Sequence, residues 1–176
     1  MVGIGATRQG ELPGRSANAL GVDALALALA DAGISKDQLD GLITCKVFGS
    51  NEGIDTQIGS LAGLNPAYSA TLEYGTCNFS LHLAAMAIQA GLASTVALIY
   101  GTNQRTAGQR FTSVADSADR ELLEPYGFVN IAGVAALAAS RRAHLYGLTD
   151  AQLGHVAVNQ RFNARLNPLA IFTDPL

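Results

Sequence analysis

Hydrophobic and polar positions alternate along the chain in blocks that predict an α/β fold. Short apolar runs are separated by alanine- and leucine-rich stretches in which apolar residues recur at helical spacing. The short runs predict buried strands, and their alternation with helices predicts a mostly parallel sheet flanked by helices. The expected strands are Val2–Arg8, Leu42–Phe48, Tyr68–Glu73 and Thr95–Tyr100.

Three helices are expected between these strands. The first runs from Ser16 to Ala32, and Gly33 follows it where a C-terminal cap belongs. Ser35 and Gln38 form a capping-box pattern soon afterwards. The other two helices are Asp55–Leu61 and Phe79–Ala90. Because Phe79–Ala90 is apolar almost all round, we expect it to be central and buried.

The character of the chain changes after Gly101. The segment Gln104–Tyr126 is polar, charged and irregular, so we expect a loop excursion. Two further helices are predicted, at Val129–Tyr146 and Asp150–Arg161. We therefore divide the chain into an α/β core, residues 1–103, and a loop subdomain with its following helices, residues 104–176.

Composition and charge narrow the classes of partner. Hydrophobic residues make up 49% of the chain and charged residues only 14%, which indicates that another chain or a further domain covers part of the surface. We therefore expect a homo-oligomer or an accessory subunit. The net charge of −3 and the lack of a basic stripe argue against a nucleic-acid partner. The apolar runs are too short to cross a bilayer, so no membrane span is expected.

The cysteines and histidines suggest neither disulfides nor a metal site. Two cysteines do not make a disulfide framework, and no secretory signal is visible, so we expect a reducing, cytoplasmic location. Cys45 lies in an expected strand and is predicted to be in the core. His82 is interpreted as a core or interface residue, and His144 and His155 as solvent-facing ones. No cluster has metal-ligand spacing.

Two stretches of the chain resemble the thiolase superfamily. The run from Glu73 to Gly91, with the strand that leads to Gly101, is similar to the family's nucleophile helix and next strand. Arg141–His155 and Asn159–Pro168 resemble the loop-domain helices of the sterol-carrier and lipid-transfer branch. The resemblance covers almost the whole chain and implies a thiolase-like layered fold.

The resemblance also implies that the chain corresponds to an N-terminal half. In that family two similar halves pack back to back, each with a five-stranded sheet, and this chain is expected to lack the C-terminal half. The family's catalytic histidine and second cysteine lie in that half, and none of the three histidines here matches the position. We therefore expect the isolated chain to be inactive in full thiolase chemistry.

The resemblance points to two candidate catalytic residues, Cys77 and Tyr74. Family members place the nucleophilic cysteine at the start of the buried helix, 17 positions before the glycine that ends it; counting back from Gly91 gives Tyr74. A helix N-terminus would favour a thiolate at Cys77, whereas a tyrosine could exchange a proton. The plain alternatives are a small buried cysteine and a packed, strand-end tyrosine.

The leading hypothesis is a thiolase-like protein that makes or breaks a C–C bond next to a coenzyme A thioester. Acyl-CoA would be the substrate, with no bound cofactor. An acyltransferase would work through a cysteinyl thioester, with backbone N–H groups stabilising the oxyanion or enolate. One alternative is a retro-aldolase that lacks the nucleophilic cysteine and relies on proton transfer. Another is a non-catalytic, partner-dependent subunit.

A nucleotide-binding doubly wound domain is a further alternative. Gly3 and Gly5 form a Gly-x-Gly pair, which after a strand could open a dinucleotide fingerprint. Arg8 stands where the third glycine of that fingerprint belongs. Tight packing at a strand end explains the two glycines equally well.

Overall fold

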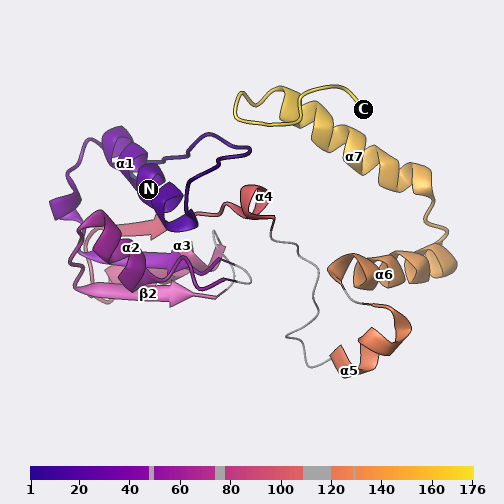
Figure 1. The fold of residues 1–176 in the computed structure, drawn as a ribbon, viewed down its shortest axis with the longest axis horizontal. Helices are drawn as coiled ribbons and strands as arrows, with labels where there is room; N and C mark the ends of the chain where they lie inside the picture. The colour runs from indigo at the N-terminus through magenta and orange to yellow at the C-terminus, as the bar shows by residue number, and fades with distance from the viewer. Residues whose placement is uncertain (48–49, 74–77, 109–119, 129) are drawn as a thin grey trace. The chain divides into compact units, whose positions relative to one another are not determined.

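The computed structural model describes residues 1–47, 50–73, 78–108, 120–128 and 130–176. The chain divides into two compact units, Met1–Ala107 and Gly108–Leu176, and each is described by itself. The first unit contains a parallel sheet flanked by helices, which confirms the predicted α/β class (Figure 1). The described residues of the second unit are helical or irregular.

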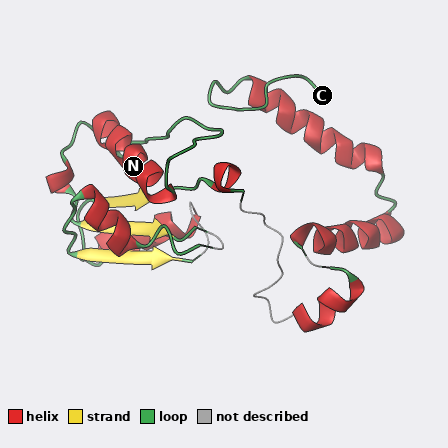
Figure 2. Cartoon of the chain, in the orientation of Figure 1, coloured by secondary structure: helices red, strands yellow, loops and turns green. Residues whose placement is uncertain are grey.

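The sheet of the first unit has three strands, β1 (Gly41–Cys45), β2 (Tyr68–Leu72) and β3 (Val96–Ile99). Their order is β2-β1-β3, and both pairings are parallel, so all three arrows point the same way in Figure 2. Parallel neighbours need crossover connections. Helix α2 (Asp55–Ala62) connects β1 to β2, and α3 (Asn78–Gln89) connects β2 to β3.

The core of this unit lies where β1 meets the helices. Successive side chains of a strand point to opposite faces. Leu42 packs with Ile58 of α2 and Leu25 of α1 (Ala17–Ala32), and its neighbour Ile43 is also fully buried. Because α3 packs against β1 and β3, it covers the face to which Ile43 belongs. The central strand is therefore buried on both faces.

The caps that the sequence predicts for α1 are present. The Ser16 side chain accepts a hydrogen bond from the backbone N–H of Ala19, and Gly33 closes the helix in the left-handed region with a φ of 67°. The capping box of Ser35 and Gln38 forms around a short 3-10 turn, η1 (Lys36–Gln38). These local signals fix the helix ends at the residues that the pattern predicts.

Gly101 allows α1 to lie unusually close to the end of β3. A Cβ atom at Gly101 would stand 2.1 Å from the Ala17 carbonyl oxygen and 2.7 Å from the Gly21 nitrogen. Both atoms belong to helix backbone and cannot rotate away. Only a residue without a side chain fits between α1 and the chain that leaves β3.

We expect Gly101→Ala to lower the free energy of unfolding by about 2 kcal/mol, because the added methyl group forces the backbones apart. Urea unfolding followed by circular dichroism measures the change. Gly59→Ala is the matched control. Its Cβ would meet the Leu42 side chain at an ordinary 3.5 Å, so stability should stay level or rise. Equal stabilities for the two variants would contradict the close approach.

The predicted first strand, Val2–Arg8, is wrong. This segment forms no strand in the structure. A Cβ at Gly5 would stand 2.1 Å from the Ala24 carbonyl oxygen, so the segment lies directly on α1. The Ile4 N–H donates to the Asp31 carboxylate at 2.8 Å instead of to a neighbouring strand. An apolar run alone does not reveal whether its backbone has a ladder partner.

The prediction that the helix following β2 is central and buried is also wrong for the described unit. Only Ser80, Ala84 and Ala87 of α3 are buried, and these small side chains share one helix face. The large side chains point away, with Phe79 66% and Met86 63% exposed. His82 is likewise exposed, so it is not in the core of this unit, and its place in an interface stays a prediction. Apolar composition indicates that a helix suits burial, but it does not specify what covers it.

A short helix, α4 (Gln104–Ala107), ends the first unit. Residues 109–119 of the expected excursion lie outside the described residues. The described part of the second unit then contains four further helical elements. They are α5 (Arg120–Leu123), the 3-10 turn η2 (Glu124–Tyr126), α6 (Ile131–Tyr146) and α7 (Asp150–Arg165).

The second unit confirms two helices that the periodicity predicts. Thr149 and Gln152 form a complete capping box at the start of α7. His144 and His155 are exposed, as expected. The segment after α7 folds back, and Arg161 holds it by donating to the Asp174 carbonyl oxygen at 2.7 Å. Across the described part of both units, no helix combines the length and apolarity needed to span a bilayer.

Candidate functional site

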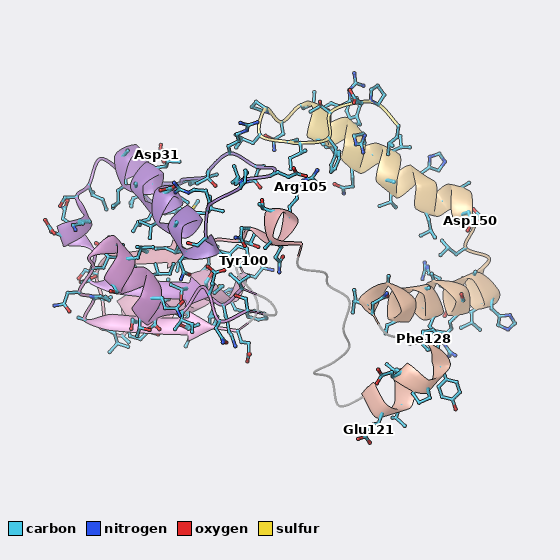
Figure 3. All side chains as sticks on the ribbon, in the orientation of Figure 1. Asp31, Tyr100, Arg105, Glu121, Phe128 and Asp150 are labelled. Carbon is cyan, nitrogen blue, oxygen red and sulfur yellow. The ribbon has the colours of Figure 1, made fainter. Side chains whose placement is uncertain are left out.

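The carboxyl edge of the parallel sheet is the candidate site. In open α/β sheets, ligands bind outside the carboxyl ends of the strands. Because the three strands are parallel, Lys46, Glu73 and Tyr100, which directly follow them, lie at the same edge. Tyr100 stands at the end of β3 with its side chain partly exposed (Figure 3). Two charged side chains and one phenol therefore gather at this edge.

Lys46 and Glu73 are paired at this edge. Their Nζ and Oε1 atoms are 3.6 Å apart, with the Lys46 side chain 33% and the Glu73 side chain 70% exposed. The Lys46 backbone N–H also donates to the Leu72 carbonyl oxygen at 2.8 Å, which continues the β1–β2 ladder past the strands. A pair this exposed contributes little to stability. Both groups remain accessible to a molecule that binds at the edge.

The two residues that the resemblance singled out, Tyr74 and Cys77, lie outside the described residues. Their catalytic roles therefore stay predictions. The described part of α3 begins at Asn78, the residue after Cys77 in the sequence. Cys45 is 2% exposed within β1, which confirms its place in the core.

A network of hydrogen bonds joins α2 to strands β1 and β2. The Asp55 carboxylate accepts hydrogen bonds from Ser69 Oγ at 2.6 Å and from Thr71 Oγ1 at 2.8 Å. The Asp55 backbone N–H donates to the same Thr71 oxygen at 2.8 Å. Thr44 Oγ1, which is fully buried, lies 3.2 Å from it. The single Thr71 hydroxyl proton goes to Asp55, so Thr44 is the donor to Thr71.

This network sets the charge state of Asp55. Burial of the carboxyl raises its pKa, but the hydrogen bonds from Ser69 and Thr71 outweigh that effect, and the pKa lies below its ordinary value of 3.8. Asp55 is therefore ionised at neutral pH. Its charge lies at the N-terminus of α2, where the helix dipole favours an anion.

We expect Asp55→Asn to reduce stability at pH 7 and to make stability less sensitive to acid. A carboxyl whose pKa is lower in the folded state stabilises the fold above its unfolded pKa, here about 3.8. That contribution disappears as the pH falls through the folded pKa. The two melting temperatures should therefore differ above about pH 5 and converge as the pH falls below about 3.8. A constant difference across this range would contradict the assignment, and Asp37→Asn, at an exposed aspartate, is the control.

The sequence did not reveal these polar contacts. The only signal for the network is the spacing of Ser69 and Thr71, which places both hydroxyls on one face of the predicted strand. The partner Asp55 comes from a different element. Among the described residues, no group of three or more His, Cys, Asp or Glu side chains could hold a metal ion.

Comparison with known proteins gives relatives along nearly the whole chain, although no protein-family model matches it. It is 35% identical to the steroid side-chain-cleaving aldolase of Thermomonospora curvata, over 98% of this chain and 46% of that protein. It is also 35% identical to the 17-hydroxy-3-oxo-4-pregnene-20-carboxyl-CoA lyase of Mycobacterium tuberculosis, over 98% of this chain and 47% of that protein. An acetyl-CoA acetyltransferase of Methanocaldococcus jannaschii is 33% identical, over 98% of this chain and 45% of that protein. The chain is related to thiolase-type enzymes.

A solved structure supports the same relation. The Ltp2-ChsH2(DUF35) aldolase superposes on 99% of this chain with a TM-score of 0.85 and 33% sequence identity. The match covers 46% of that chain. This thiolase-related chain therefore spans about half the length of the curated relatives it matches. The relatives with the higher identities are an aldolase and a lyase, which favours the retro-aldolase alternative over the acyltransferase hypothesis.

Proposed function

We propose that the chain is part of a lyase that cleaves a C–C bond next to a coenzyme A thioester by a retro-aldol reaction. The observation that carries this proposal is its 35% identity to a side-chain-cleaving aldolase and to a carboxyl-CoA lyase. The substrate class would be β-hydroxyacyl-CoA thioesters, and coenzyme A would enter as part of the substrate. The sterol-carrier and lipid-transfer branch of the thiolases fits this chemistry.

The reaction needs proton transfer and no covalent intermediate. A base removes the proton of the β-hydroxyl group as the C–C bond breaks, so the carbinol carbon becomes a ketone or aldehyde. The electron pair of the broken bond passes to the thioester as an enolate. A proton delivered to the α-carbon then gives the shortened acyl-CoA. The protein has to place one acid–base group and stabilise the enolate oxygen.

Tyr74 is our proposed acid–base group, because it occupies the place of the nucleophilic cysteine in the pattern that the chain resembles. A phenol can pass a proton to or from a hydroxyl group. Cys77 would act as the nucleophile only in the thiolysis alternative. The identity to an acetyl-CoA acetyltransferase supports that alternative. That alternative requires free coenzyme A to attack a cysteinyl thioester.

The dependence on free coenzyme A separates the two reactions. The protein is incubated with 17-hydroxy-3-oxo-4-pregnene-20-carboxyl-CoA, the substrate in the name of one relative, and the products are followed by mass spectrometry. We expect a ketone and a shortened acyl-CoA without added coenzyme A. Turnover of a 3-ketoacyl-CoA only when coenzyme A is added would replace the lyase proposal with the acyltransferase one.

We also propose that the chain works with a partner or further polypeptide. It matches just under half of each relative, and the similar solved aldolase, Ltp2-ChsH2(DUF35), carries two components in its name. Native mass spectrometry of the purified protein tests this dependence. A complex heavier than the 18.2 kDa of this chain, active where the separated chain is not, is the expected result. Full activity of the isolated 18.2 kDa chain would rule the dependence out.

A further inference from the structure

A short loop near the N-terminus, Gly10–Gly14, contacts helix α4. The Leu12 N–H donates to Thr106 Oγ1 of α4 at 2.8 Å, although the two residues are 94 positions apart in the sequence. Glu11 and Arg105 add an ion pair, with Oε1 and Nε 3.8 Å apart. Both contacts are polar, and they join the start of the chain to the last element of the first unit.

The loop is anchored on both sides. Before it, the segment that contains Gly5 lies directly on the backbone of α1. After it, the Arg15 carbonyl oxygen accepts a hydrogen bond from Asn103 Nδ2 at 2.8 Å, and the Arg15 guanidinium pairs with Asp23 of α1. Any movement of the loop is therefore confined to the few residues between these anchors.

Two glycines bracket the middle of the loop. Gly10 and Gly14 have φ values of 123° and 75°, and a Cβ atom at either position would meet no atom within 4 Å. Glycine at a positive φ with open space around it suits a hinge, because its backbone can change conformation without a clash. None of the residues 10–14 is buried, so little apolar packing holds the loop in place. Its closed position depends mainly on the two polar contacts to α4.

We propose that Glu11–Pro13 is a strap that opens from α4 and closes on it while the rest of the first unit stays folded. Within α4, the Asn103 carbonyl oxygen accepts from the N–H groups of Thr106 and Ala107, at 2.9 Å each. A helix of four residues is unstable by itself, so α4 loosens when the strap opens. Because the chain continues from α4 into the second unit, the strap controls whether the start of that connection is held. This inference does not depend on the proposed function.

Native-state hydrogen exchange, followed by NMR on the parent protein, tests the strap. A local opening exposes little surface, so exchange of the Leu12 N–H should barely respond to low concentrations of urea. Exchange of the β1 amides, which requires unfolding of the sheet, should accelerate steeply with urea. An equal dependence on urea for Leu12 and β1 would mean that the loop and the sheet open only together, and the strap proposal would then be wrong.

A substitution in α4 tests whether the strap and the helix move together. Thr106→Val removes the acceptor of the Leu12 N–H and keeps the size of the side chain. We expect exchange at Leu12 and at Ala107 to become about fivefold faster, the effect of one hydrogen bond, with the β1 amides unchanged. Thr106→Ser retains a hydroxyl group and should restore the parent rates.

Thr56→Val is the matched control. Thr56 is exposed on α2, and its hydroxyl group makes no hydrogen bond to the described residues. This variant should leave exchange at Leu12 and Ala107 unchanged. Faster exchange at Leu12 alone in Thr106→Val, with Ala107 at its parent rate, would overturn the coupling between the strap and α4. Unchanged exchange at both positions would overturn the strap itself.

Discussion

Tyr74→Phe is expected to slow C–C cleavage of a β-hydroxyacyl-CoA about a hundredfold or more. The substitution keeps the ring and removes only the hydroxyl group that would carry the proton. A positioned acid–base group typically accelerates a reaction by about 10²–10⁴. Steady-state assays of the ketone product, with the protein in its active assembly, measure the effect. The loss should fall on kcat more than on KM, because the proton moves in the transition state.

Cys77→Ser distinguishes the lyase from the acyltransferase in the same assay. A retro-aldolase needs no cysteinyl thioester, so this variant should keep nearly all of the parent rate. Thiolysis through Cys77 would instead lose most of its activity with a weaker nucleophile. Tyr146→Phe, on the exposed end of α6, controls for the loss of a phenol elsewhere. Unchanged rates in both Tyr74→Phe and Cys77→Ser would remove both residues from the chemistry.

Ile58→Ala should strongly destabilise the described core, with a loss of about 3 kcal/mol in the free energy of unfolding. Ile58 is 1% exposed and packs from α2 against α1 and the sheet. Truncation removes buried methyl groups and leaves a cavity that two helices and a strand cannot easily close. Urea unfolding monitored by circular dichroism measures the change. If only stability is affected, the slope of the unfolding free energy against urea concentration should stay the same.

Leu61→Ala is the matched control for that experiment. Leu61 lies on the same helix, α2, but 55% of it is exposed. Its truncation should cost well under about 1 kcal/mol. Similar losses for the two variants would mean that α2 does not bury the face assigned to it here.

The elements predicted best from the sequence are those with local signals. Helix α1 has a capping serine before it and a left-handed glycine after it, and both act within a few residues. Strands β1 and β3 are short, largely apolar runs that alternate with helices, which is typical of a parallel sheet. Such features depend on the order of neighbouring residues, so they can be inferred without knowing the fold.

The features that the sequence did not predict depend on contacts between distant residues. Val2–Arg8 has the composition of a strand, but Gly3 and Gly5 bring it onto the backbone of α1. The Asp55 network joins residues from separate elements, α2 and β2. The candidate residues Tyr74 and Cys77 came from the resemblance alone. Periodicity predicts which face of an element is apolar, but it does not identify the group that meets a given polar atom.

The strand order β2-β1-β3 has a consequence for how the protein is made. The first of these strands to leave the ribosome, β1, becomes the middle one, and the ladder on its second side needs Val96–Ile99. More than fifty residues must therefore be synthesised after Gly41 before this strand is paired on both sides. Throughout that interval one edge of an apolar strand is open to pairing with other nascent chains. We infer that early folding, before the third strand emerges, is the stage at which this protein is most prone to aggregate.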